Sequence, residues 1–346
     1  MGRRARVLQQ VLPPSSGEPH HPASSSMPEE RAEGAVAAGV VVPRWEGLPS
    51  CFEPARVPAR NPHFIFNGQV LAHLQTALLM SFAVLVIGDA GIGKTALVEG
   101  LAHLAGAPLV RIQGHGHLLA HDLLGIRILR NGTTVFEEGP FALAYRNGWW
   151  VLIDELTAIP PGTLQALHAA LDGAALTLPD GNVIVRGRGL HVFGTSNTAG
   201  AAAERRHHYA GNFAMNDATL GRFVVIRPPA LSIPEVTTLL LRWACTSTRP
   251  SIAGTASQLA TFYARARHAA FAEQSDGVPC VAYALTLRDL EALWKVYLHP
   301  VTLSQGRTRW RTVREAADAT IVHRFADRDA KLVLEMLRTD VAEVSR

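Results

Sequence analysis

The sequence predicts an α/β fold with a mainly parallel sheet, and three observations lead to this expectation. From about residue 60 onward, short apolar runs alternate with segments of helical character, the pattern that places helices on both faces of a parallel sheet. The runs AVLVI (83–87) and WWVLI (149–153) are apolar throughout, as expected of strands buried on both faces. A third run, LHVFGTSN (190–197), is a strand that ends in polar residues.

Length and composition set the domain organisation. The chain has 346 residues, of which 48% are hydrophobic and 18% charged, enough to bury a substantial core and to form about two domains. Ten of the 21 prolines precede residue 63, so we expect residues 1–59 to be a disordered Pro/Ser-rich segment. We assign residues 60–230 to the α/β core. Residues 231–346 are assigned to a helical lid domain with a C-terminal extension, on the resemblance described below.

The first residues and the cysteines indicate in which cellular compartment the protein is expected. The opening MGRRARV is basic but no apolar stretch follows, which argues against a secretory signal. Residues 1–26 are interpreted either as an organelle transit peptide or as an over-long start with translation from Met27. Three widely spaced cysteines, Cys51, Cys245 and Cys280, indicate reduced thiols. Because the apolar runs are far shorter than the roughly 18 residues of a membrane span, we expect a cytoplasmic protein with no membrane segment.

The first chemical motif is GDAGIGKT (88–95), which follows the strand AVLVI and fits the P-loop pattern. Glycines let the backbone N–H groups curl around phosphate, and the next helix N-terminus favours negative charge. Lys94 is one of only three lysines among 33 basic residues, and a compact ammonium suits a loop wrapped around phosphate. We therefore predict that ATP is the cofactor. Its predicted contacts are Gly88, Asp89, Ala90, Gly91, Ile92, Gly93, Lys94 and Thr95.

The second motif is the acidic pair at the end of WWVLI, Asp154 and Glu155. A carboxylate at a strand end beside the P-loop can hold Mg²⁺, and a second one can polarise the attacking water. We assign Asp154 to Mg²⁺, together with the Thr95 hydroxyl, and Glu155 to the general base. The third motif supplies Asn197, whose amide is a candidate to hydrogen-bond the same water or the terminal phosphate.

Three of the arginines that follow the third strand are candidate site residues. TLGRF and VVIRPP supply Arg222 and Arg227, and LTLRDL supplies Arg288. Thr286 and Asp289 form an N-terminal capping pattern that places Arg288 in the first turn of a helix. A cation at that position opposes the helix dipole, so a phosphate partner explains it better than solvent does.

The order of these motifs resembles a known family. GDAGIGKT, HDLLG, FEEGPFALAYRNG, VLIDEL, GTSNTAG, YAGNFAMNDATLGRF and LTLRDL are similar to segments of the AAA+ ATPases of the MoxR branch, most closely the CobS-type subunit of cobaltochelatase. The resemblance covers about residues 60–300. It implies an α/β ATPase core, a small helical lid and a homo-oligomeric ring, typically of six subunits, with ATP between neighbours.

The resemblance also implies roles for single residues. By position, Arg222 resembles the arginine finger that reaches into the next subunit's site, Asn197 resembles sensor 1 and Arg288 resembles sensor 2. Should Arg222 not act as the finger, Arg227 is the next candidate. In this family the ring remodels a protein partner, often one with a von Willebrand A-type domain.

Two hairpins agree with that family. RILRNGTTVF is predicted to turn at Asn131-Gly132, and ALTLPDGNVIVR at Asp180-Gly181, because Asn-Gly and Asp-Gly favour tight hairpin turns. In MoxR-type proteins two such insertions face the pore or the partner, although both segments are also compatible with ordinary surface hairpins.

Other segments depart from the family. AAAERRHHY (201–209) replaces the segment expected of a CobS protein, and residues 301–346 carry no recognisable match. We therefore expect chaperone-like remodelling of a partner in preference to cobalt insertion. His115, His117 and His121 form a local cluster with Asp122, and His207 and His208 are two further histidines that could add to it. We assign this cluster no ligand role, because a tight zinc site usually shows cysteines or a well-defined helical pair.

Two other function classes compete with a remodelling ATPase. A nucleotide-driven nucleic-acid machine of the McrB restriction type should show a basic surface interleaved with aromatic residues. The net charge of +4 is small and the arginines are scattered, so nucleic-acid binding is not indicated. A small-molecule kinase is disfavoured by Glu155 and by the long lid-like C-terminal region.

Overall fold

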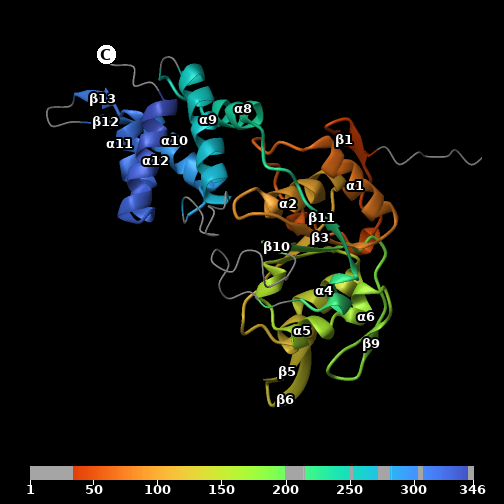
Figure 1. The fold of residues 1–346 in the computed structure, drawn as a ribbon. Coiled ribbons are helices and arrows are strands. Elements are labelled where there is room, and N and C mark those ends of the chain that lie inside the picture. The colour runs from red at the N-terminus through yellow and green to blue at the C-terminus, as the bar shows by residue number, and fades with distance from the viewer. Residues whose placement is uncertain are drawn as a thin grey trace, which may run out of the picture. The chain divides into compact units, whose positions relative to one another are not determined.

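The computed structural model describes residues 34–198, 213, 215–249, 252–271, 281, 283–302 and 307–341. The expectations for residues 1–26, for the segment 201–209 with its two histidines, and for Cys280 lie outside these ranges. Residues 33–346 belong to one unit. Along the chain, an α/β core is followed by a mainly helical C-terminal region (Figure 1).

A five-stranded parallel sheet forms the centre of the α/β core. Its spatial order is β11-β3-β10-β7-β4, and every neighbouring pair is parallel. The strands are β3 (Ala83–Ile87), β4 (Leu109–Gln113), β7 (Trp150–Asp154), β10 (Val192–Ser196) and β11 (Phe223–Ile226). The three apolar runs identified in the sequence therefore become β3, β7 and β10, and the predicted α/β class with a parallel sheet is confirmed.

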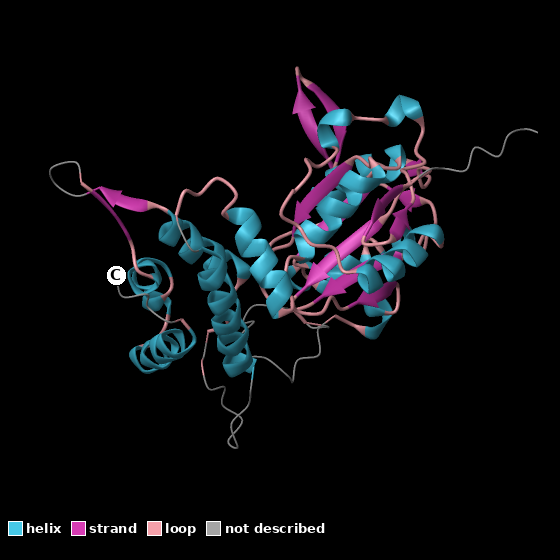
Figure 2. Cartoon of the chain, turned by 90° about the horizontal axis from the view of Figure 1, so that it is seen from above, coloured by secondary structure: helices cyan, strands magenta, loops and turns pink. Residues whose placement is uncertain are grey.

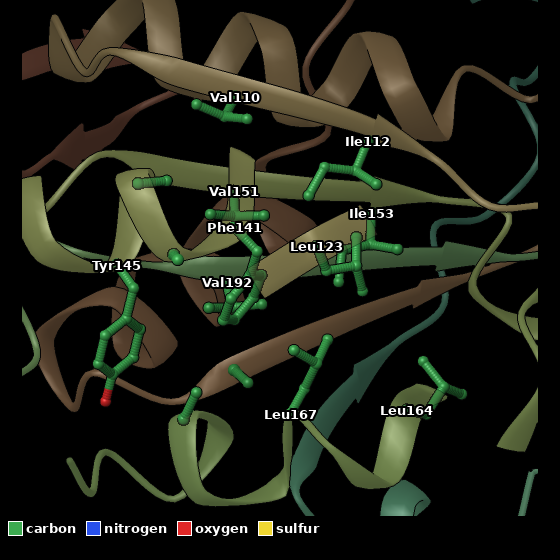
Figure 3. Close-up of a cluster of buried hydrophobic side chains, with 14 of the residues drawn as sticks. Val110, Ile112, Leu123, Phe141, Tyr145, Val151, Ile153, Leu164, Leu167 and Val192 are labelled. Atoms are coloured by element: carbon green, nitrogen blue, oxygen red, sulfur yellow. The ribbon is translucent and has the colours of Figure 1, made fainter. Parts of the chain in front are cut away.

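Both faces of the sheet are buried because successive side chains alternate between two cores. In β7, Val151 and Ile153 belong to one cluster of buried apolar side chains, whereas Trp150 and Leu152 belong to the other. Figure 3 shows part of the first cluster, in which strand residues such as Val151 and Val192 pack with Phe141, Tyr145 and other helical residues. Strands buried on two sides need apolar residues at every position, which explains their continuous apolar sequences.

Helices cover each face of the sheet, and Figure 2 shows the strands lying among them. The cluster that contains Trp150 also takes its side chains from α1 (Gly68–Leu79) and α2 (Lys94–Ala105). The other cluster is completed by short helices: α3 (Ala120–Leu124), α4 (Pro140–Asn147), α5 (Pro161–Gln165) and α6 (His168–Leu171). One further short helix, α7 (Asp217–Leu220), and the 3-10 turn η3 (Leu156–Ala158) complete the core.

Both predicted hairpins are present. Strands β5 (Gly125–Arg130) and β6 (Thr133–Glu138) are antiparallel and turn through Asn131 and Gly132, at φ of 52° and 77°. Strands β8 (Leu176–Thr177) and β9 (Val183–Ile184) pair around a longer loop that contains Gly181 at φ 92°. Left-handed backbone at these positions is what Asn and Gly adopt most readily.

The expected disorder of residues 1–59 is wrong for the described part of that segment. It contains β1 (Ala35–Ala37), β2 (Val40–Val42), η1 (Pro49–Cys51) and η2 (Pro54–Arg56). Val42 is buried in the core, and the indole of Trp45 donates to the Gly148 carbonyl at 2.7 Å. A few apolar anchors thus hold a Pro-rich segment whose average composition resembles that of disordered chains.

The C-terminal region has its own hydrophobic core, built around Phe262, Trp294 and the helices that carry them. Its helical elements are α8 (Ile233–Trp243), α9 (Ile252–Phe271), α10 (Leu287–Leu298), α11 (Val313–Thr320), η4 (Val322–Arg324) and α12 (Asp327–Asp340). A hairpin of β12 (Pro300–Thr302) and β13 (Thr308–Trp310) joins α10 to α11. None of the helices that the structure describes combines the length and the apolar character that crossing a bilayer requires.

Candidate functional site

Most of the predicted site residues meet at the carboxyl ends of β3, β7 and β10, which are neighbours in the sheet. A cavity of about 480 Å³ opens there, hereafter the P-loop cavity. Its walls include residues 90–97 of the loop and α2, the pair Asp154 and Glu155, and residues 195–197. Leu287, Arg288 and Glu291 of α10 line the same cavity. Residues from sequence positions about 200 apart therefore share one space.

Glycine is required at two positions of the loop that joins β3 to α2. Gly91 and Gly93 have φ of 75° and 90°, a left-handed conformation that residues with a Cβ adopt at a cost. A Cβ on Gly91 would also lie 2.4 Å from the Cβ of Thr286. The loop therefore keeps its path, and its close contact with the start of α10, only with glycine.

Lys94 begins α2 and turns back over the loop. Its Nζ donates to the carbonyls of Gly88 and Asp89, at 2.7 and 3.0 Å, and to Oδ1 of Asn197 at 2.8 Å. Burial lowers the pKa of Lys94 from 10.5 to about 8, while the nearby carboxylates of Asp154, Asp89 and Glu155 oppose this shift. The structure thus joins two predicted residues, Lys94 and Asn197, by a direct hydrogen bond.

Asp154 is only 7% exposed and accepts several hydrogen bonds. Thr95 Oγ1 lies 3.0 and 3.1 Å from its two carboxylate oxygens, and Arg111 Nη2 lies 2.6 Å from Oδ2. The Thr195 hydroxyl donates to Oδ1. Thr95 and Asp154, the two residues predicted to hold Mg²⁺, are therefore adjacent and present hard oxygen atoms of the kind that this ion prefers.

Glu155 follows Asp154 in a left-handed conformation, at φ 56° and ψ 52°. Its backbone N–H donates to the Thr195 hydroxyl at 3.0 Å, so the same threonine holds both acidic residues. The Glu155 residue is exposed and lines the P-loop cavity. Left-handed backbone at a residue other than glycine costs about 1 kcal/mol or more, and here it occurs at a cavity wall.

Arg288 lies in the first turn of α10, as the capping pattern predicted. Thr286 is the N-cap, its side chain accepts from the Asp289 N–H, and the Asp289 carboxylate accepts from the Thr286 N–H. This capping box buries Asp289 and leaves Arg288 exposed at the wall of the P-loop cavity.

The structure does not bring Arg222 to the P-loop cavity of its own chain, since Arg222 is absent from the cavity's described lining. Its Nε pairs with Asp172 at 3.0 Å, and its Nη1 donates to the Ala218 carbonyl at 2.6 Å. Arg227 is exposed and lines a separate depression with His73 and Asn67.

Sequence reasoning missed three residues of the site: Thr195, Arg111 and His63. Thr195 lies inside a run that was read as a strand, and Arg111 lies on β4, where no motif marks it. His63 lines the P-loop cavity, and its Nδ1 is buried without a hydrogen-bond partner among the described residues. The chain order around His63 carries no recognisable pattern.

The histidine cluster carries no sign of a metal site. His115, His117 and His121 are all exposed. Within the residues covered by the structure, no group of three or more His, Cys, Asp or Glu side chains is arranged to hold a metal ion. The absence of a ligand role, as expected, stays a prediction for the cluster together with His207 and His208.

Comparison with known proteins shows which protein family the segments of the site resemble. Residues 83–211 match the family model described as "AAA domain (dynein-related subfamily)". Midasin of Giardia intestinalis is 29% identical over 196 residues, which are 55% of this chain and 4% of midasin. Protein NorQ of Paracoccus denitrificans is 32% identical over 111 residues, 32% of this chain and 41% of NorQ. Both matches thus span less than half of the relative's length.

Among solved structures, a Thermotoga maritima RuvB mutant aligns over 80% of this chain and 70% of that one, with a TM-score of 0.42 and 17% identity. The family match spans β3, the P-loop, the acidic pair and β10. It therefore covers the P-loop, Asp154, Glu155 and Asn197, whereas the cavity walls at residues 61–70 and 228–291 lie outside the match.

Proposed function

We propose that this chain, which carries an AAA+ ATPase domain, hydrolyses ATP with Mg²⁺ as a subunit of a ring and uses the energy to remodel a protein partner. The observation that carries the proposal is the convergence of Lys94, Thr95, Asp154, Glu155 and Asn197 on one cavity. These are the groups that phosphoryl transfer to water needs: a cation for the phosphates, oxygen ligands for a metal, a base and a polar amide.

At the phosphate end, Lys94 exchanges its bonds to the Gly88 and Asp89 carbonyls for phosphate oxygens. It stays near Asn197, whose amide can then contact the terminal phosphate. Thr95 and Asp154 would hold Mg²⁺, which when bound neutralises charge on the phosphates. Arg111 orients the Asp154 carboxylate through its 2.6 Å hydrogen bond.

Glu155 is the proposed base because it lies next to Asp154, lines the cavity and is accessible to water. The Thr195 hydroxyl fixes its backbone and the Asp154 carboxylate together. Because one hydroxyl bonds to both residues, the base stays at a fixed distance from the metal-binding carboxylate. Catalysis by oriented groups requires such fixed geometry.

At the other end of the P-loop cavity the walls suit a nucleobase. They include the apolar side chains of Phe64, Val70, Leu239 and Trp243, together with His63 and Asn61. The buried, unpaired Nδ1 of His63 is a polar group that a base edge can satisfy. We propose that the adenine lies here, with its face against the apolar residues.

The ring is proposed from the position of Arg222. Asp172 holds its guanidinium away from its own chain's P-loop cavity, yet 27% of the side chain is exposed. In a ring, the resemblance places this arginine at the boundary, where it would stabilise the charge that builds on a neighbour's γ-phosphate.

Mixing two inactive variants tests the ring. Arg222→Ala should bind ATP but lose hydrolysis by up to about 10³-fold, as expected of an arginine finger. Lys94→Ala should be inactive because it binds no nucleotide. Mixing the two should restore activity, since one interface then combines an intact P-loop with an intact finger.

Arg227→Ala is the matched control, because Arg227 is exposed and lies five residues further along the same segment. It should keep wild-type activity. A mixture that stays inactive while subunits demonstrably exchange, or normal hydrolysis by Arg222→Ala alone, refutes the finger assignment and makes Arg227 the next candidate.

The partner surface is proposed to be the two hairpins. Leu129 of β5 is 76% exposed and Val183 of β9 is 61% exposed, so both present apolar side chains to solvent. Exposed apolar residues on projecting hairpins favour contact with another protein. By resemblance to the MoxR branch, the partner is a von Willebrand A-type or metal-chelatase protein.

A pull-down tests this surface. The Glu155→Gln variant with ATP should hold the partner-bound state and retain a von Willebrand A-type protein. Adding Leu129→Asp should release it, whereas Val36→Asp, at a residue 68% exposed on β1, should not. Equal retention by both double variants would exclude the hairpin as the contact.

A further inference from the structure

A buried arginine connects the helical C-terminal region to the P-loop. Arg267 lies on α9 and is only 6% exposed. Its Nη2 donates to Asp89 Oδ2 at 3.2 Å, and its Nη1 donates to the Leu285 carbonyl at 2.8 Å. Asp89 is the second residue of the P-loop motif, so this ion pair joins residues 178 positions apart at the phosphate-binding loop.

The surroundings hold the guanidinium of Arg267 in place. Its Cζ lies over the rings of Tyr263 and Phe271, at 5.7 and 5.3 Å from their centroids. A cation buried against aromatic rings needs an anionic partner, because removing one member of a buried ion pair leaves the other uncompensated. The Asp89 side chain, 23% exposed, supplies that charge.

A second contact lies beside the ion pair. Leu285, whose carbonyl accepts from Arg267, directly precedes Thr286, the N-cap of α10. Thr286 in turn lies so close to Gly91 that no side chain fits on that glycine. Arg267 therefore contacts both the P-loop and the residue before the helix that carries Arg288.

The charge of Asp89 raises a problem for phosphate binding. A carboxylate in a loop that wraps around a triphosphate repels the ligand, and the repulsion is strong in a partly buried site. Asp89 and Arg267 both lie close enough to act on Lys94, whose pKa the first raises and the second lowers. The positive charge of Arg267 thus offsets the negative charge of Asp89 in the electrostatic potential at the phosphate position.

We propose that Arg267 is a positioning residue that masks the Asp89 carboxylate, so that the P-loop accepts a triphosphate only while α9 is docked on it. This inference rests on the proposed nucleotide binding. It makes ATP affinity depend on the contact between the C-terminal region and the loop. Movement of α9 away from Asp89 would expose the negative charge and favour nucleotide release.

A set of charge-removing variants tests the proposal, with the dissociation constant of ATP measured by titration calorimetry on the full chain. Arg267→Met should weaken ATP binding about tenfold, since coupling between contacting charges is of that order. Asp89→Asn should tighten it, because the unmasked Arg267 then attracts phosphate. The double variant should return to within about threefold of the wild type, because its net charge is restored.

The size of the effect should follow the charge of the ligand. The weakening in Arg267→Met should be largest for ATP, smaller for ADP and absent for adenosine. A purely structural role of Arg267 in the fold of α9 would weaken all three ligands alike. It would also leave the double variant as weak as Arg267→Met, and either result overturns the proposal.

Arg265→Met is the matched control. Arg265 lies on the same helix and pairs with Asp340, but it does not contact the P-loop. Its loss should leave ATP affinity unchanged. If Arg267→Met fails to fold, as circular dichroism would show, Asp89→Asn still decides the matter, since unchanged or weaker ATP binding by that variant contradicts masking.

Failure of the ion-pair proposal can be told apart from failure of the proposed function. If the wild type binds ATP, Lys94→Ala does not, and Arg267→Met binds like the wild type, only the role of Arg267 is refuted. If the wild type shows no ATP binding, both proposals are refuted together.

Discussion

The two ends of the central sheet differ in how they satisfy buried polar groups. At the carboxyl end, charged side chains bond to other side chains: Lys94 to Asn197, and Asp154 to Thr95 and Arg111. At the amino end, indoles donate to backbone carbonyls, as Trp150 does to Gly189 at 3.1 Å. The same strands thus carry an ionic site at one end and neutral aromatic packing at the other.

The pKa values of His191 and Lys94 show how this difference affects the protonation of buried side chains. Burial, and then Arg186, lowers the pKa of His191 at the amino end from 6.5 to about 4, so His191 is neutral at pH 7. Burial lowers the pKa of Lys94 to about 8 against the opposing carboxylates, so Lys94 keeps its proton at pH 7. The carboxyl end therefore keeps a buried lysine protonated, whereas the buried histidine at the amino end is neutral.

The largest expected effect comes from removing that cation. Lys94→Ala should weaken ATP binding by about 100-fold or more, because the phosphates lose a hydrogen-bonded charge partner in a partly buried site. Titration calorimetry measures this directly. Unchanged affinity would refute the assignment of the carboxyl end as a phosphate site.

A smaller effect should appear on changing pH. Phosphate raises the pKa of Lys94 in the complex above its free value of about 8, so binding favours the protonated lysine. Affinity should be full below pH 8 and fall by about tenfold per pH unit above it. The measurement is the ATP dissociation constant between pH 7 and 9.5.

Lys94→Arg is the matched control for the pH series. Arginine stays protonated throughout this range, so the variant should bind ATP more weakly than the wild type but without the decline above pH 8. A flat profile for the wild type would contradict the depressed pKa of Lys94.

The smallest effect is expected from a substitution at the amino end of the sheet. It should change the free energy of unfolding and leave ATP binding unchanged. Trp45→Phe removes the N–H that bonds the Gly148 carbonyl at 2.7 Å. The free energy of unfolding should fall by about 1–3 kcal/mol, while the ATP dissociation constant stays unchanged. Val36→Ala, at an exposed residue of the same segment, should change neither quantity. A loss of ATP affinity in Trp45→Phe would show that the two ends are coupled.

Local sequence patterns predicted the motif residues at the carboxyl end of the sheet, but not the residues that hold those motifs in place. The P-loop, the acidic pair and the Thr286 cap are each encoded within a few residues, so their positions follow from short-range rules. Thr195, Arg111 and Arg267 reach the site only through the packing of strands and helices, and no nearby motif marks them. Their contacts depend on tertiary structure, which a single sequence does not display.

Near the amino end of the sheet, the sequence led to a wrong prediction of a different kind. Proline-rich composition predicted disorder up to residue 59, yet Val42 and Trp45 pack into the core. Average composition underestimates what a few anchors contribute, since large-to-small substitution of a single core side chain costs about 2–5 kcal/mol.

The Glu155→Gln variant tests whether the carboxyl end of the sheet hydrolyses ATP with Glu155 as the base. Glutamine keeps the shape and the backbone bond to Thr195 but cannot take a proton. The measurement is phosphate release from ATP, together with the ATP dissociation constant, for this variant and the wild type. We expect unchanged ATP affinity and loss of phosphate release by about 100-fold or more. Ordinary turnover by Glu155→Gln would contradict it.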